Sequence, residues 1–137
     1  LDWDVDLVVL AGFMRILSEK FVKAWEGKML NIHPSLLPYY KGMHTHQRVL
    51  NTGDVLHGCT VHYVTPELDA GQALAQGVLK ISHQDTTYTL AQRVHVLEHL
   101  IYPQVVEWIC NGTIQHTEQG VLYRNAKMQE PVQFCKF

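Results

Sequence analysis

Residues 29–38 read Met-Leu-Asn-Ile-His-Pro-Ser-Leu-Leu-Pro, and the rest of the chain is organised around this stretch. It begins as an apolar strand and ends as a loop between two prolines. Alternate side chains of a strand point to the same face, so the side chains of Asn31 and His33 can reach the same point. Pro34 has no N–H for a ladder, so regular pairing is expected to stop near His33. The pattern indicates either a catalytic corner or a core histidine beside a turn asparagine.

A second strand is expected at residues 7–12, where the sequence is apolar and nearly unbroken, as in parallel sheets covered on both faces. Between the two strands, residues 18–25 are expected to form a helix that begins at Ser18. Strand, helix and strand predict a parallel βαβ unit with a right-handed crossover. Ligands bind beyond the carboxyl ends of strands in such sheets, so residues 11–14 and 31–33 are expected to be neighbours at a site.

Further along the chain, the residue patterns predict several more elements. They are a short helix at 45–51, two antiparallel strands at 57–65 and 73–81, a long helix from 85–87 to 111, and short strands or irregular cover at 113–116, 121–123 and 132–137. Pro103 is expected to kink or divide the long helix. The predicted fold class is therefore α/β, a Rossmann-like sheet that is mostly parallel with an antiparallel hairpin and has helices on both faces.

Composition narrows the class of protein. The chain has 137 residues, of which 47% are hydrophobic, so residues 1–137 are expected to form one domain. Eleven basic residues against 13 acidic ones give a net charge of −2 without a basic stripe, which argues against a nucleic-acid binder. No apolar run reaches membrane-spanning length and no signal peptide opens the chain. Three cysteines without a C-x-x-C pair argue against a disulfide framework and favour a reducing cytoplasm.

Histidines are numerous, but their spacing does not predict a metal site. His44 and His46 could reach one ion, yet no carboxylate or cysteine stands beside them at ligand spacing. A zinc site needs three or four convergent ligands, so these two histidines are interpreted as loop polar groups or caps.

Five motifs follow one another along the chain. They are Ala-Gly-Phe-Met-Arg-Ile-Leu at 11–17, Asn-Ile-His-Pro-Ser-Leu-Leu-Pro at 31–38, His-Thr-His at 44–46, His-Gly-x-x-Val-His at 57–62 and Glu-Leu-Asp-Ala-Gly at 67–71. In this order they resemble the glycinamide ribonucleotide formyltransferases, folate-dependent enzymes of de novo purine synthesis. The resemblance covers nearly the whole chain and weakens after Gly112. It implies a formyltransferase-type sheet in which residues 1–137 form the C-terminal two-thirds or so of a single catalytic domain.

The resemblance also implies a reaction. A formyl group passes from 10-formyltetrahydrofolate to the amine of glycinamide ribonucleotide, and Asn31, His33 and Asp69 are the implied catalytic residues. Attack on the formyl carbon creates an oxyanion, to which the Asn31 amide can donate a hydrogen bond. A protonated His33 stabilises the same charge and can supply a proton to the leaving folate nitrogen. A carboxylate at Asp69 favours the imidazolium and can accept the amine's proton through a water.

Binding residues are implied in the same way. The folate co-substrate would be held by Met14, Arg15, Ile16, Leu17, Val64, Thr65 and Asp69. The nucleotide would be held by Gly12, Ile32, Pro34 and Glu98, with Glu98 on a ribose hydroxyl. No metal is implied. The expected partners are these two small molecules, without nucleic acid or membrane, in the cytoplasm, and a weak homodimer is left open.

Three alternatives differ in the acceptor or in catalysis itself. A formyltetrahydrofolate hydrolase would use the same three residues with water as acceptor, although Pro34 directly after the histidine favours the transferase. Methionyl-tRNA formyltransferases usually continue into a nucleic-acid-binding domain, and this chain is not basic. A folate-binding fragment without catalysis is the third alternative.

The sequence departs from the pattern of this family at its beginning. The family's glycine-rich phosphate-binding turn and its first strands belong upstream of Leu1. Residues 1–137 alone are therefore expected to expose an apolar sheet edge, and to be poorly stable or inactive without a complementary piece.

Overall fold

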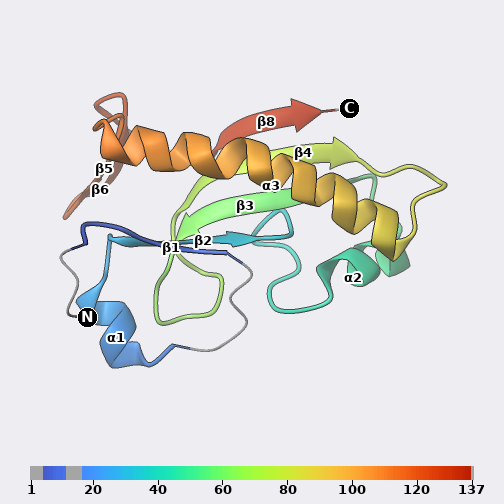
Figure 1. The fold of residues 1–137 in the computed structure, drawn as a ribbon, viewed down its shortest axis with the longest axis horizontal. Helices are drawn as coiled ribbons and strands as arrows, with labels where there is room; N and C mark the ends of the chain where they lie inside the picture. Colours follow the sequence, from blue (N-terminus) through green and yellow to red (C-terminus); the bar gives the residue numbers. More distant parts are fainter. Residues whose placement is uncertain (1–4, 12–16, 137) are drawn as a thin grey trace.

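The computed structural model describes residues 5–11 and 17–136 of the chain (Figure 1). Its elements follow the predicted order closely. They are β1 (Val8–Leu10), α1 (Glu19–Ala24), β2 (Met29–His33), α2 (Thr45–Thr52), β3 (Leu56–Tyr63), β4 (Ala73–Lys80), α3 (Thr87–Cys110), β5 (Ile114–Thr117), β6 (Gly120–Tyr123), β7 (Ala126–Lys127) and β8 (Val132–Lys136). Most predicted boundaries lie within two residues of the observed ones, and β7 is a strand that sequence reasoning missed.

The main sheet has five strands in the order β1-β2-β3-β4-β8. The pairs β1–β2 and β4–β8 are parallel, whereas β3 is antiparallel to both β2 and β4. Within this sheet β3 therefore runs against the other four strands. The predicted α/β class, with a mostly parallel sheet and an antiparallel hairpin, is confirmed. A second, antiparallel sheet joins β5, β6 and β7.

Helix α3 covers one face of the main sheet (Figure 1). Its first turn is fixed by a capping box between Thr86 and Thr89. Gly77 on β4 allows close approach, because a Cβ there would lie 3.1 Å from the Cβ of Leu97 and 3.2 Å from the sulfur of Cys59. The buried stripe of the helix consists of Leu90, Val94, Leu97, Ile101 and Val105.

Pro103 lies inside α3, and the helix is not divided there. Of the two expected effects, a kink or a division, the division does not occur. Proline removes one backbone hydrogen bond at a cost of about 3 kcal/mol or more. Buried residues stand on both sides of it in α3, including Ile101 and Val105, and their packing on one sheet outweighs that local cost.

The opposite face of the sheet carries a buried polar network that holds the loop after β2. The Thr60 hydroxyl on β3 donates to the Ser35 carbonyl at 2.7 Å and accepts from the Leu37 amide at 3.1 Å. The Gln76 amide on β4 donates to the Leu37 carbonyl at 2.9 Å and to the Thr60 hydroxyl at 3.1 Å. The loop is therefore fixed to the sheet directly after His33.

Strand β1 lies at one end of the described five-stranded sheet, and β8 lies at the other end. β1 is an edge strand, and the Val9 side chain is 45% exposed. Helix α1 begins at Ser18, whose hydroxyl accepts a hydrogen bond from the Phe21 amide at 3.2 Å, and it lies near β1, apart from α3 (Figure 1). Within residues 5–11 and 17–136, no helix combines the length and hydropathy that crossing a bilayer requires. The expected low stability of residues 1–137 alone stays a prediction.

Candidate active site

Asn31 and His33 stand at the carboxyl end of β2 and project from the face opposite α3. The intervening Ile32 points the other way, into the hydrophobic core. In the antiparallel register Asn31 lies opposite His62, and His33 lies opposite Thr60. Strand alternation and register therefore gather an amide, a hydroxyl and two imidazoles on one side of the sheet.

The imidazole of His33 is buried and is held between two acceptors. Its Nε2 lies 2.8 Å from the Tyr40 carbonyl oxygen, so Nε2–H donates to that carbonyl. Its Nδ1 lies 3.5 Å from Oδ2 of Asp69. Because both ring nitrogens face oxygen acceptors, the imidazolium form of His33 satisfies both contacts.

Asp69 reaches this corner from the loop between β3 and β4. Its backbone adopts a left-handed conformation with φ of 50°, which asparagine and aspartate tolerate better than most residues. Its Oδ2 accepts a hydrogen bond from the Gly42 amide at 3.0 Å, and its Oδ1 lies 3.9 Å from Nε2 of His62. The carboxylate thus joins two loops and both histidines, although its side chain is only 7% exposed.

Two buried polar atoms at this corner have no hydrogen-bond partner within residues 5–11 and 17–136. They are Oδ1 of Asn31 and Nε2 of His62. The Nδ1–H of His62 donates to the Tyr63 carbonyl at 2.9 Å, and burial lowers the pKa of His62, which favours a neutral ring with a bare Nε2. Buried polar atoms are nearly always paired in native proteins, so these two atoms mark a place where a ligand's polar groups fit.

His62, the Tyr40 carbonyl and the Gly42 amide are site groups to which sequence reasoning gave no role. For His62 a signal existed, because the predicted hairpin allows a register that sets it opposite Asn31. The two backbone groups carry no such signal, because any residue type supplies a carbonyl and an amide. Their positions follow from the path of the loop after β2.

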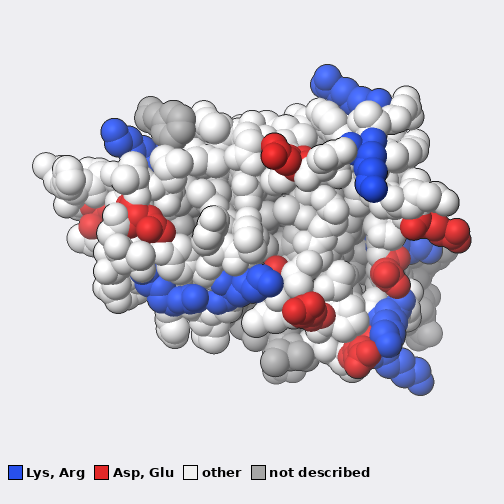
Figure 2. Space-filling model, turned by 180° about the vertical axis from the view of Figure 1, so that it is seen from behind, with Lys and Arg blue, Asp and Glu red and all other residues white. Residues whose placement is uncertain are grey.

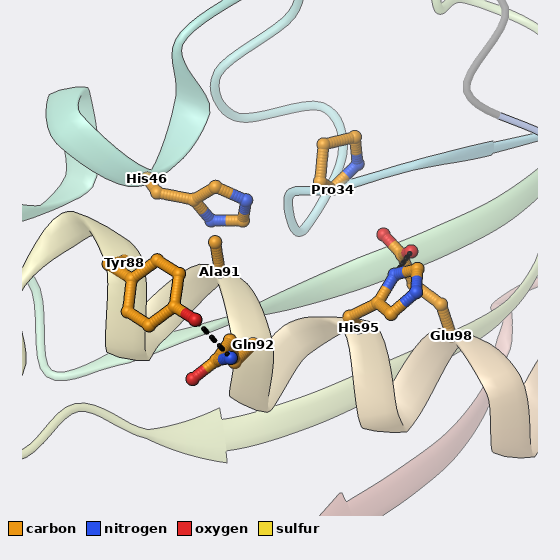
Figure 3. A pocket seen from close by; sticks show the side chains of 7 residues that line it. All are labelled: Pro34, His46, Tyr88, Ala91, Gln92, His95 and Glu98. Atoms are coloured by element: carbon orange, nitrogen blue, oxygen red, sulfur yellow. Dashed lines mark hydrogen bonds and ion pairs between the residues drawn. The ribbon is translucent and has the colours of Figure 1, made fainter.

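A pocket of about 350 Å³ lies on the α3 side of the strand end (Figure 3). It contains Pro34 and Glu98, two residues expected to hold the nucleotide. Burial raises the pKa of the Glu98 carboxyl, while the hydrogen bond from His95 acts in the opposite direction. The full lining is Pro34, His46, Tyr88, Ala91, Gln92, His95 and Glu98. Pro34 directly follows His33, so it connects this pocket to the corner formed by Asn31, His33 and Asp69.

One wall of the pocket is backed by a pair of histidines. Nδ1 of His46 on α2 lies 2.9 Å from Nε2 of His57 on β3, so one of the two rings donates to the other. Burial lowers the pKa of His57 to about 4, and burial also lowers the pKa of His46. Both rings are therefore neutral near pH 7, and the pair ties α2 to the sheet.

The remaining predicted binding residues have varied positions. Val64 and Thr65 open the loop that carries Asp69, and Leu17 is half-buried just before α1. The side chain of Ile32 lies in the core, so only its backbone is available to a substrate. Gly12, Met14, Arg15 and Ile16 lie outside the described residues.

In the described residues, neither a charged patch on the face shown in Figure 2 nor a group of three or more metal-ligating side chains adds a further site. On that face, basic and acidic side chains are interspersed. In the part of the chain that the structure describes, no group of three or more His, Cys, Asp or Glu side chains is arranged to hold a metal ion.

Comparison with known proteins identifies the family. A family model described as formyl transferase matches residues 2–106. Phosphoribosylglycinamide formyltransferase of Escherichia coli K12 is 49% identical over 115 residues, which are 84% of this chain and 54% of that protein. The human trifunctional purine biosynthetic protein adenosine-3 is 49% identical over 119 residues, which are 87% of this chain and 12% of that protein.

A solved structure agrees with these relatives. Phosphoribosylglycinamide formyltransferase from Coxiella burnetii, in complex with CHES, matches with a TM-score of 0.90 at 47% identity, over 96% of this chain and 62% of that one. The chain therefore spans about half the length of the Escherichia coli relative and a small part of the human one. From its sequence and its fold, the chain belongs to the formyl transferase family.

Proposed function

We propose that this chain is the catalytic part of a phosphoribosylglycinamide formyltransferase, which transfers a formyl group from 10-formyltetrahydrofolate to the amine of glycinamide ribonucleotide in purine (IMP) biosynthesis. The observation that carries the proposal is the corner of Asn31, His33 and Asp69 in a member of this family, with two buried polar atoms that lack a partner among the described residues. Residues 1–137 belong to one domain in this proposal, because one hydrophobic core includes residues from β2 to Met128. The proposed location is the cytoplasm.

Asn31 is proposed to bind the oxygen of the transferred formyl group. Its amide stands on a rigid strand, which fixes the direction of its N–H donors before the reaction begins. Its Oδ1 is an acceptor without a partner within the described residues, whereas the two Nδ2–H groups of the same amide are the donors that would bind this oxygen. Amide donors placed in this way stabilise the charge that develops on the oxygen during amine attack.

His33 is proposed to share that charge and to protonate the leaving folate nitrogen. In the present structure its Nε2–H donates to the Tyr40 carbonyl and its Nδ1 faces Asp69. For Nε2–H to reach a substrate, the bond to Tyr40 has to be exchanged for a bond to the ligand. The contact with Asp69 remains through this exchange and keeps the imidazolium oriented.

Asp69 is proposed to hold His33 in its charged form and to accept the proton lost by the attacking amine, through a water molecule. The carboxylate is itself oriented by the Gly42 amide. His62 presents its Nε2 lone pair on the other side of the same carboxylate, at 3.9 Å. That distance suits a water molecule between the two groups better than a direct hydrogen bond.

The substrates are proposed to occupy the two sides of the β2 end. The folate lies against Leu17, Val64, Thr65 and the Asp69 loop, together with Met14, Arg15 and Ile16, which the structure does not describe. The nucleotide lies at Gly12, the backbone of Ile32, and Pro34, with Glu98 in the α3 pocket accepting a ribose hydroxyl. The proposed partners are these two molecules, without nucleic acid, membrane or metal cofactor, and a weak homodimer is compatible with this arrangement.

The test is formyl transfer from a 10-formyl folate to glycinamide ribonucleotide, followed by the absorbance of the deformylated folate. The full-length polypeptide is compared with its Asn31→Ala, His33→Ala and Asp69→Ala variants. We expect turnover that requires the nucleotide, and a fall of about 10²–10³ in kcat for Asn31→Ala, the size found for loss of one oxyanion donor. His83→Ala is the matched control, because His83 is exposed in the loop before α3.

Two other outcomes would replace the proposal. Folate consumption at the same rate without nucleotide would identify a formyltetrahydrofolate hydrolase. Absence of turnover in folded, full-length protein that still binds folate would identify a binding protein without catalysis.

A further inference from the structure

Three side chains on the exposed face of α3 form a cluster outside the catalytic corner. They are His95, Glu98 and His99, at helix positions i, i+3 and i+4. Nε2 of His95 lies 2.9 Å from Nε2 of His99, and Nδ1 of His95 lies 3.2 Å from Oε2 of Glu98. Figure 3 shows the contact between His95 and Glu98. Residues three and four apart on a helix share one face, so the backbone of α3 fixes this arrangement.

The proton positions in this cluster follow from the acceptors. The carboxylate of Glu98 accepts, so Nδ1–H of His95 donates to it and the neutral ring carries its lone pair on Nε2. That lone pair faces Nε2 of His99. Without a metal, Nε2–H of a neutral His99 ring can donate to that lone pair, as one ring does to the other in the His46–His57 pair. A metal ion bound by both rings would take the place of this hydrogen bond.

The separation of the two nitrogens suits neighbouring ligands of one metal ion. Zinc–nitrogen bonds are about 2.0–2.1 Å long, so two nitrogens about 90–110° apart at the metal are about 2.9–3.4 Å from each other. The observed separation is 2.9 Å, and the ring centroids are 4.4 Å apart. The separation therefore suits two ligands of one ion, and binding requires the two Nε2 lone pairs to turn from each other toward that ion.

The surroundings of His95 are those of a metal ligand. Histidines that bind metals usually donate their other N–H to a carboxylate, which fixes the ring and increases its basicity. Glu98 is such a carboxylate, and its side chain is only 19% exposed, whereas the side chain of His95 is 67% exposed. His99 is also exposed. An ion from solvent can thus reach both Nε2 atoms, and the less exposed Glu98 carboxylate orients one of the two rings, that of His95.

We propose that His95 and His99 form a two-histidine site for a divalent transition metal ion such as Zn²⁺, Ni²⁺ or Cu²⁺, with Glu98 orienting His95 and water completing the coordination. Imidazole ligands select these ions over Mg²⁺ and Ca²⁺, which prefer oxygen. His95 and Glu98 also line the α3 pocket, so a bound ion changes the charge at its rim. This last consequence rests on the proposed function, whereas metal binding itself does not.

The test is calorimetric titration of the full-length polypeptide with ZnCl₂, without substrates, so that its result is independent of catalysis. The exposed cysteines Cys110 and Cys135 are first replaced by serine, because thiolates also bind zinc. We expect one saturable site, which is lost in His95→Ala and in His99→Ala. Glu98→Gln should weaken binding by about 10-fold or more, the size found for loss of an orienting carboxylate. Bound Co²⁺ should give a visible spectrum that disappears in the same variants.

The controls separate this site from general surface binding. Alanine is the best helix former, so both histidine variants should keep α3, which circular dichroism checks. His83→Ala should bind zinc as before, and MgCl₂ should give no saturable heat. The proposal is overturned if zinc binding survives in both α3 histidine variants, if it is lost in a His44→Ala variant instead, or if binding does not saturate below the millimolar range.

Discussion

His57 should make the folded protein sensitive to mild acid. Its side chain is 1% exposed on β3, and its Nε2 contacts Nδ1 of His46. Burial lowers its pKa from 6.5 to about 4 in the folded protein. Between these two values the unfolded chain binds more protons than the folded one. The stability that His57 contributes is therefore complete above about pH 6.5 and is lost as the pH falls toward 4.

The size of the effect follows from the two pKa values. Between about pH 7.5 and pH 5, protonation of His57 in the unfolded chain should lower the free energy of unfolding by about 2 kcal/mol. Burial also lowers the pKa of His62, so the whole protein should lose stability in the same direction. The contribution of His57 is obtained by subtraction, because a His57→Gln variant keeps a polar side chain there and cannot titrate.

The assay is urea unfolding at the two pH values, monitored by tryptophan fluorescence. We expect His57→Gln to be less stable than the parent at about pH 7.5, yet to lose about 2 kcal/mol less on acidification. His83→Gln, in an exposed loop, should follow the parent at both pH values. Equal losses in the parent and in His57→Gln would refute the reasoning, because His57 would then not be held neutral by burial.

Three further predictions concern packing and the pocket. Thr60→Val should lower the free energy of unfolding by about 2–4 kcal/mol in urea titrations, because it leaves the Ser35 carbonyl and the Leu37 amide buried without their partner; a loss below about 0.5 kcal/mol would contradict this. Leu97→Ala should cost about 2–5 kcal/mol, since Leu97 is 2% exposed, and a neutral effect would mean that α3 repacks. Glu98→Gln should raise KM for glycinamide ribonucleotide by about 10-fold or more with little change in kcat, as expected for a lost hydrogen bond to a charged acceptor; an unchanged KM would remove Glu98 from the nucleotide site.

Local sequence patterns were sufficient for most of the fold. The alternation of side chains in β3 and β4, the apolar stripe on α3 and the prolines after β2 are patterns within a few neighbouring residues. Each of them predicts the local structure of its own segment. The structure confirms the elements that these patterns predicted. The sequence around Pro103 left a kink and a division open, and the helix is not divided, because a local rule sets the cost of a proline in a helix while long-range packing sets the gain.

The candidate site could be predicted from the sequence only in part. The order of the motifs was enough to indicate the family, and alternation was enough to put Asn31 and His33 on one face. Their relation to Asp69 could not be derived from spacing alone, because a left-handed residue in a loop decides where that carboxylate points. The pocket between Pro34 and Glu98 likewise depends on how α3 crosses the strand end.

The sequence by itself therefore determined that Asn31 and His33 stand on one strand and share one of its faces, because these properties follow from backbone geometry over a few residues. Only the tertiary structure decided that the Tyr40 carbonyl accepts from His33 and that the Gly42 amide donates to Asp69. It also decided that His62 leaves a lone pair beside that carboxylate. The physical reason is that backbone groups are identical in every residue. Their positions are set by the packing of two loops on the sheet.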